Sequence, residues 1–169
     1  MTAAPSPVEF VAAAARSAWR LEMRDGYMRS DPWYQAWQAG RAAEYEANTP
    51  RPWLDLIREV TGRSVDVRRT RIISEPASDY IRFEHATTPG NIAAGERVRW
   101  VPRPRAAALA LPGTDCWIRD AEAVLFSHYT GDGEVAGRDL TTDPGVVRLC
   151  ATAFEAAWEL GVDHEAYQV

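Results

Sequence analysis

The sequence predicts a small α+β or α/β protein with a mixed sheet, packed helices and a helical cap near its N-terminus. Three observations lead to this fold class. Residues 1–62 mostly carry apolar side chains at helical spacing, residues 63–160 alternate between strand and helix patterns, and the last strands follow one another through tight turns. Strands joined by a helix pair in parallel, whereas strands joined by tight turns pair antiparallel. We therefore expect a parallel pair of strands beside an antiparallel meander.

The chain length of 169 residues fits one folded unit. Within it we expect an N-terminal helical segment over residues 1–62 that packs on the body. The body is the mixed sheet domain of residues 63–160, and residues 161–169 are expected to form a C-terminal tail.

Helix signals dominate the first segment. A capping box over residues 6–9 opens a helix expected over residues 7–17. The residues that follow, through Met23, fit either a continued helix or a strand, and their pattern does not separate the two. The strongest helical period lies in residues 52–62, where apolar residues repeat at i, i+3, i+4 and i+7.

A helix is also expected after Pro32, ending at Gly40, with Trp33, Tyr34 and Trp37 on one face. Two tryptophans one turn apart can bury a large apolar area, so the favoured interpretation is that this helix docks on the body through them. An aromatic cage for a ligand is the alternative interpretation.

The body alternates strands and helices, with a chain break expected at residues 88–91. Strands are expected over residues 65–74, 98–101, 116–119, 124–129 and 134–138. Helices are expected over residues 78–86, over residues 105–111 and from Pro144 onward.

Composition excludes several classes of function. The formal net charge is -5 and the basic residues are 19 arginines with no lysine. Nucleic-acid-binding domains usually carry a basic excess, so direct nucleic-acid binding is not expected. Without lysine the chain can have no Schiff-base lysine and no P-loop lysine, which excludes pyridoxal phosphate bound as an internal aldimine.

Cysteines and hydropathy give further expectations. Cys116 and Cys150 form no CxxC pair and have no histidine at zinc-ligand spacing, so we expect free buried thiols, no metal and no cofactor. No apolar run approaches the roughly 18 residues of a membrane span. No basic region precedes the Ala-rich N-terminal stretch. We therefore expect a cytoplasmic protein without membrane association.

Polar side chains are concentrated where the strand of residues 65–74 leads into the next helix. Pro76 and Ser78 open that helix, and free N–H groups at a helix N-terminus favour negative charge. We expect a pocket for a small polar or anionic ligand, with an arginine gripping a carboxylate or phosphate. The alternative is that these groups only cap the helix and form ion pairs. The candidate ligand-binding residues are Arg71, Ser74, Glu75, Asp79, Tyr80 and Arg82.

No catalytic residue can be named from the sequence. His85, His128 and His164 are isolated along the chain, and His128 could meet Asp115 or Asp132 only through folding. The chain carries no nucleophile elbow, no GxGxxG and no HExxH.

Four stretches together resemble an uncharacterised family of small actinobacterial proteins that are often encoded beside helix-turn-helix regulators. They are residues 71–84, residues 97–102, the Leu111-Pro112 step and residues 115–129. The resemblance extends from about Phe10 to Trp158 and is most specific over residues 74–84. The resemblance implies that the gene lies beside the gene of a regulator, and it implies no chemical mechanism.

The order of strands in the body also resembles half of a phospholipase D-type domain. In that fold the hairpin corresponding to residues 116–126 carries a His-x-Lys pair, whereas residues 115–120 here contain neither residue. The resemblance therefore implies a domain that binds rather than cleaves, because the nucleophile is missing.

The leading functional hypothesis is a non-catalytic ligand-sensing or regulatory module that acts with a helix-turn-helix regulator. A second hypothesis is a small enzyme of specialised metabolism that uses Glu75, Asp79, Tyr80 and Arg82 for acid–base chemistry. A third is a component of a toxin–antitoxin pair.

Overall fold

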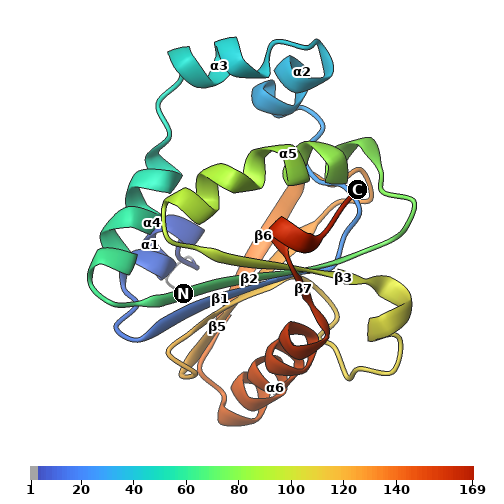
Figure 1. Cartoon of the computed structure of the whole chain (residues 1–169). Coiled ribbons are helices and arrows are strands. Elements are labelled where there is room, and N and C mark those ends of the chain that lie inside the picture. Colours follow the sequence, from blue (N-terminus) through green and yellow to red (C-terminus); the bar gives the residue numbers. More distant parts are fainter. Residues whose placement is uncertain (1–3) are drawn as a thin grey trace.

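A computed structural model describes residues 4–169, which form a seven-stranded mixed sheet in the order β6-β5-β4-β1-β2-β3-β7 (Figure 1). The strands are β1 (Ser17–Glu22), β2 (Asp66–Ile73), β3 (Arg97–Pro102), β4 (Cys116–Arg119), β5 (Ala123–Tyr129), β6 (Val135–Thr141) and β7 (Val162–Asp163). β1, β2 and β3 run parallel, and β4, β5 and β6 continue from β1 as an antiparallel meander. The predicted mixed fold is confirmed.

Helices cover both faces of this sheet (Figure 1). The helices are α1 (Pro7–Ala12), α2 (Pro32–Gln38), α3 (Ala42–Asn48), α4 (Pro52–Gly62), α5 (Asp79–Ala93) and α6 (Pro144–Leu160). α1, α4 and α5 lie on one face, α6 lies on the other, and α2 and α3 form a further layer outside α5. None of the helices within residues 4–169 is both long and apolar enough to cross a bilayer.

The face under α6 is apolar. Leu21, Ile72, Val101 and Ile118 point to it from four neighbouring strands and pack against one side of the helix. Trp19 stacks on Phe154 of α6 with ring centroids 5.1 Å apart. This face forms one of the apolar cores of the molecule.

The N-terminal segment differs from the expected cap because it supplies a central strand. α1 ends at Ala12 rather than near residue 17, and Ser17–Glu22 forms β1 between β4 and β2. Of the two alternatives left open for these residues, the strand is the one observed. Its side chains alternate between the two faces, with Leu21 under α6 and Glu22 on the opposite side.

The break expected at residues 88–91 is wrong, because α5 continues through Pro89 to Ala93. Proline cannot donate to the carbonyl four residues earlier. The preceding turn is supported by side chains instead. Thr87 donates its hydroxyl to the Phe83 carbonyl at 3.0 Å, and Thr88 donates to the Glu84 carbonyl at 2.7 Å.

The helix expected over residues 105–111 is also wrong. Only a short 3-10 turn, Arg103–Ala106, forms there. The segment lies between prolines 102, 104 and 112, and a helix this short cannot recover the cost of its first turn.

The last nine residues, expected as a tail, pack on the sheet. β7 pairs with β3, and Tyr167 stacks on Trp100 with ring centroids 5.7 Å apart. The Trp100 indole donates to Nδ1 of the buried His164 at 3.1 Å. Burial and the neighbouring His85 lower the pKa of His164.

Candidate functional site

The sheet face under α5 carries charged side chains where the opposite face carries apolar ones. Arg20 and Glu22 occupy alternate positions of β1, and Arg69 and Arg71 occupy alternate positions of β2. All four side chains are buried. Because side chains two residues apart share a strand face, the two strands together place four charges side by side.

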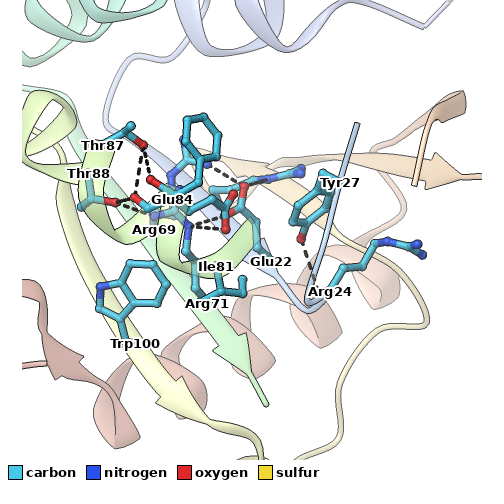
Figure 2. Close-up of polar contacts among 12 residues, drawn as sticks. Glu22, Arg24, Tyr27, Arg69, Arg71, Ile81, Glu84, Thr87, Thr88 and Trp100 are labelled. Atoms are coloured by element: carbon cyan, nitrogen blue, oxygen red, sulfur yellow. Dashed lines mark hydrogen bonds and ion pairs between the residues drawn. The ribbon is translucent and has the colours of Figure 1, made fainter. Parts of the chain in front are cut away.

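Three guanidinium groups converge on the carboxylate of Glu22. Arg69 donates from Nη1 to Oε1 at 2.6 Å, and Arg71 donates from Nε to Oε2 at 2.8 Å (Figure 2). Arg20 adds a longer contact from Nε to Oε1 at 3.3 Å. Burial alone would raise the pKa of Glu22, but these guanidiniums outweigh burial and hold its pKa well below the ordinary value.

The arginines have further partners at the edges of this cluster. Arg69 donates from Nε to Glu96 at 2.7 Å, and Asn91 donates to the other oxygen of Glu96 at 2.7 Å. Arg71 donates from Nη1 to the hydroxyl of Thr88 at 2.7 Å. Arg20 reaches the hydroxyl of Tyr129 at 3.0 Å. The guanidiniums are therefore held in fixed positions.

Asp115 extends the cluster toward β4. It accepts from the hydroxyl of Tyr27 at 2.5 Å and from the backbone N–H of Met23 at 2.9 Å. Burial raises the pKa of Asp115, although the nearby Arg20 opposes this shift.

Glu84 on α5 differs from every other member of the cluster. Its side chain is buried, and its Oε2 atom, which is closed to solvent, accepts no hydrogen bond from any residue that the structure describes. Its nearest cation is Arg71, whose Nε lies 3.6 Å from Oε2. Burial raises the pKa of Glu84 to about 7, partly countered by Arg71. The described residues therefore supply no hydrogen-bond donor to Oε2 of Glu84.

A cavity of about 540 Å³ lies above this cluster, between the sheet and the helices that cover it. Its charged floor consists of Arg20, Glu22, Arg69, Arg71 and Glu84. Its walls are largely aromatic and include Trp33, Trp53, Tyr80, Phe83, Trp117 and Tyr129. Thr49, Pro50 and Arg51, which join α3 to α4, lie at its rim.

α2 covers the cavity through aromatic contacts with α5. Tyr34 packs against Tyr80 and Phe83 with ring centroids 4.9 and 5.4 Å apart, and Trp33 meets Phe83 edge to face at 5.2 Å. α2 therefore docks on the body through aromatic side chains, which is the interpretation that the sequence favours. Trp33 also lines the cavity. None of the seven residues of α3 is buried, so α3 is held mainly through its neighbours.

Of the six residues expected to form one pocket, five line three separate cavities, and Arg82 lines none of these three. Arg71 and Tyr80 line the large cavity described above. Ser74 and Glu75 line a second cavity of about 440 Å³ beside Arg103. Ser74 is also bonded there to Asp25, and Glu75 accepts from the hydroxyl of Tyr167 at 2.6 Å.

The other two candidates lie further out. Asp79 and Tyr80 line a third cavity, of about 330 Å³, beside α2. Arg82 is exposed, and its Nε donates to the Ala77 carbonyl at 3.3 Å.

Four residues of the cavity floor were not among the sequence candidates: Arg20, Glu22, Arg69 and Glu84. A signal for three of them is present in the sequence. Charged residues occupy alternate positions in two stretches that otherwise read as buried strands, and alternation places both members of each pair on one face. For Glu84 we find no such signal.

The histidines do not join this cluster. His128 lies near Asp139 at 2.8 Å on the exposed meander, rather than near Asp115 or Asp132. Within residues 4–169, no three His, Cys, Asp or Glu side chains are arranged as a metal site. Cys116 and Cys150 are free and buried, as predicted.

Comparison with known proteins gives a family and a fold. A family model described as a domain of unknown function (DUF6879) matches residues 7–169. No curated protein matches the chain. A solved phospholipase D family member, Nuc from Salmonella typhimurium, is similar over 96% of this chain and 88% of its own, with 12% identity and a TM-score of 0.53. At this identity the likeness concerns the fold alone, and it agrees with the predicted phospholipase D-like order of strands.

Proposed function

Because the chain belongs to the DUF6879 family of domains of unknown function, its role has to be argued from the site, and we propose that it is a non-catalytic module that senses a small polar molecule. The ligand binds in the cavity between the charged sheet face and the helices α2, α4 and α5. Arg71 and Tyr80, two of the residues expected from the sequence, take part in this site together with Glu22 and Glu84.

The observation that carries the proposal is the buried Oε2 atom of Glu84, which accepts no hydrogen bond from the described residues. A buried charge without a donor costs several kcal/mol relative to water. A fold retains such a group at the wall of a cavity when something else supplies the donor. A bound ligand that donates a hydrogen bond to Glu84 offsets this free-energy cost of burial.

The size and lining of the cavity suit a small organic molecule. Ligand sites in proteins commonly enclose about 300–1,000 Å³ and combine apolar walls with a few convergent polar groups. The cavity here, at about 540 Å³, has aromatic walls and a charged floor. It can enclose a molecule of the size of a substituted aromatic ring system.

Sensing requires that the bound ligand alters a surface that a partner contacts. Trp33 and Tyr45 bring α2 and α3 to the cavity wall, so a ligand that touches them favours one position of these helices over others. The occupied and empty forms then differ at the outer layer of the molecule.

We further propose that the partner is a helix-turn-helix regulator encoded nearby, as in the actinobacterial proteins that the sequence resembles. The acidic balance of the chain, a net charge of -5, is complementary to a basic DNA-binding domain. Co-purification of the two proteins tests this step. Absence of a complex with and without ligand would contradict it.

Ligand binding is tested by native mass spectrometry and by thermal unfolding against a library of small polar metabolites. We expect at least one compound to raise the Tm of the wild-type protein. Thr49→Trp, which places a large side chain at the cavity rim, should reduce that response. A library without any hit, together with purified protein that retains no small molecule, would contradict the proposal.

A second candidate function, a small enzyme, is favoured by one observation. A pKa of about 7 suits Glu84 to general acid–base chemistry near neutral pH, and Tyr80 lies one helical turn away on the same cavity wall. Incubation of bound compounds with the wild-type protein and with Glu84→Gln separates the two candidates. Product formed only by the wild-type protein indicates an enzyme, and binding without turnover indicates a sensor.

A further inference from the structure

We infer that the cavity ligand carries a positively charged nitrogen, an organic ammonium or amidinium group, that binds Glu84 against the aromatic wall. This inference rests on the proposed function and adds the chemical class of the ligand. It differs from the anionic ligand that the arginines suggest when only the sequence is considered.

The buried charges do not balance. Within residues 4–169 the buried arginines are three, whereas the buried carboxylates are four, which leaves one negative charge in excess. The arginines are Arg20, Arg69 and Arg71, and the carboxylates are Glu22, Glu84, Glu96 and Asp115. A ligand with one positive charge, bound at Glu84, balances this buried set.

The excess charge can be assigned to Glu84, because each other carboxylate has its own donors. Glu22 accepts from three guanidiniums, Glu96 from Arg69 and Asn91, and Asp115 from a backbone N–H and Tyr27. Arg71 makes no hydrogen bond to Glu84 in the structure, where its Nε and Nη1 donate to Glu22 and Thr88. Its distance of 3.6 Å from Glu84 is longer than a hydrogen bond.

Aromatic rings surround the position where the cation would bind. Tyr80 lies four residues before Glu84 on α5 and therefore on the same side of the helix, and Phe83 and Trp33 line the same cavity. Ring faces carry partial negative charge and attract cations, more strongly where water is excluded. The guanidinium of Arg51 already lies 3.9 Å from the centroid of the Trp33 ring at the cavity rim.

An anionic group fits this cavity less well. Beside Glu84, the side chains of Arg20, Arg69 and Arg71 are each paired with a carboxylate, so they offer little uncompensated positive charge. Arg51 and Arg138 also line the cavity, and Arg51 lies 3.9 Å from the carboxylate of Glu46 and over the Trp33 ring. An anion placed beside the three buried arginines would also approach the unpaired carboxylate of Glu84. The same electrostatics that disfavour an anion favour a cation.

Proton release gives this inference a thermodynamic signature. Burial raises the pKa of Glu84 to about 7, so in the empty cavity near neutral pH the carboxyl group is partly protonated. A bound cation stabilises the carboxylate and displaces that proton. Affinity for a cationic ligand should therefore increase with pH through the range around 7.

Three matched probes test the inference: benzylamine, which is an ammonium ion below pH 9, benzyl alcohol and benzoate. Binding is measured by ligand-observed NMR and calorimetry at pH 7.5, with Thr49→Trp to confirm the cavity as the site. We expect the wild-type protein to bind benzylammonium at least tenfold more tightly than the other two. Glu84→Gln should lose this preference, and the control Glu59→Gln, an exposed glutamate on α4, should keep it.

The outcomes separate this inference from the proposed function. Equal or tighter cavity binding of benzoate or benzyl alcohol overturns the cationic class and leaves the cavity as a ligand site. Failure of all three probes overturns the inference, and failure of the metabolite library in addition removes the proposed function. If Glu84→Gln does not fold, calorimetry of the wild-type protein in two buffers decides, because absence of proton release at pH 7 contradicts a role for Glu84.

Discussion

Glu22 holds the charged face of the sheet together, since it accepts hydrogen bonds from three buried guanidiniums on β1 and β2. Removal of one partner from a buried ionic cluster leaves the others uncompensated, which is more costly than the pair is stabilising. The arginines can therefore line a cavity only while this carboxylate is present.

Glu22→Gln should accordingly lower the free energy of unfolding by about 3–5 kcal/mol. Urea unfolding monitored by circular dichroism measures the change. Glu59→Gln is the matched control, because Glu59 is exposed and its side chain has no partner among the described residues, and it should leave the midpoint unchanged. A decrease in the free energy of unfolding below about 1 kcal/mol for Glu22→Gln would show that water solvates the arginines in place of the carboxylate.

Glu84 should make stability depend on pH in a defined direction. Its folded pKa of about 7 exceeds the ordinary value of 4.5, so its contribution to stability is full below about pH 4.5 and is lost as pH rises through 7. Glu84→Gln does not lose this stability as pH rises, because glutamine does not ionise. Its free energy of unfolding relative to wild type should therefore rise by about 2 kcal/mol between pH 5 and pH 8. A difference that does not change between these two pH values would contradict the burial of an ionisable Glu84.

Single residues of the cavity were only partly predictable. Arg71 and Tyr80 could be named because they lie at a strand-to-helix junction that is rich in polar groups. Glu22 carries the signal of alternating charged residues in a buried strand, although it was not named as a candidate. Glu84 could not be named, since a glutamate in a helix is normally solvated, and only the packing of α5 on the sheet buries it.

At the scale of elements, periodic segments were predicted and segments with mixed signals were not. α4 follows a clear period of 3.6 residues, and tight turns mark the strands of the meander. β1 was ambiguous because its alternation spans only six residues. α5 was expected to stop before Pro89, whose local signal is overridden by the burial of Thr88 before it and the packing of Ile92 on the core after it. Tertiary packing decided both cases.

The C-terminal segment should behave as a structural element rather than as a tail. Tyr167 is buried against Trp100 and donates its hydroxyl to Glu75. Tyr167→Ala should lower the free energy of unfolding by about 3 kcal/mol, as for other buried aromatic residues, and should shift tryptophan emission to longer wavelength as Trp100 becomes accessible. The exposed neighbour Gln168→Ala serves as the control. Equal stability of the two variants would contradict docking of the segment.

At the scale of the whole molecule, the two faces of the sheet have different roles. The face under α6 forms an apolar core, and the opposite face combines an apolar end near α1 and α4 with the charged floor of the cavity. The phospholipase D-like fold supplies this frame. α2 and α3 form an outer layer over α5 (Figure 1), and Trp33 and Tyr45 of this layer line the cavity.

The outer layer should become less accessible when the cavity is filled. Gly40 and the exposed Arg41 join α2 to α3, so trypsin should cleave first after Arg41 in the empty protein. Saturating benzylamine should slow that cleavage severalfold in the wild-type protein and leave it unchanged in Glu84→Gln. Mass spectrometry of the fragments gives the rates. Equal rates with and without benzylamine in the wild-type protein would show that α2 and α3 do not respond to the cavity.

The most direct test of the account is the titration of the Glu84 carboxyl carbon by ¹³C NMR, with and without saturating benzylamine. We predict a pKa of about 7 in the free protein and a lower pKa in the presence of the ammonium ion. A pKa near 4.5 in the free protein that does not change with benzylamine would show a solvated carboxylate, and would contradict a buried cation site in this cavity.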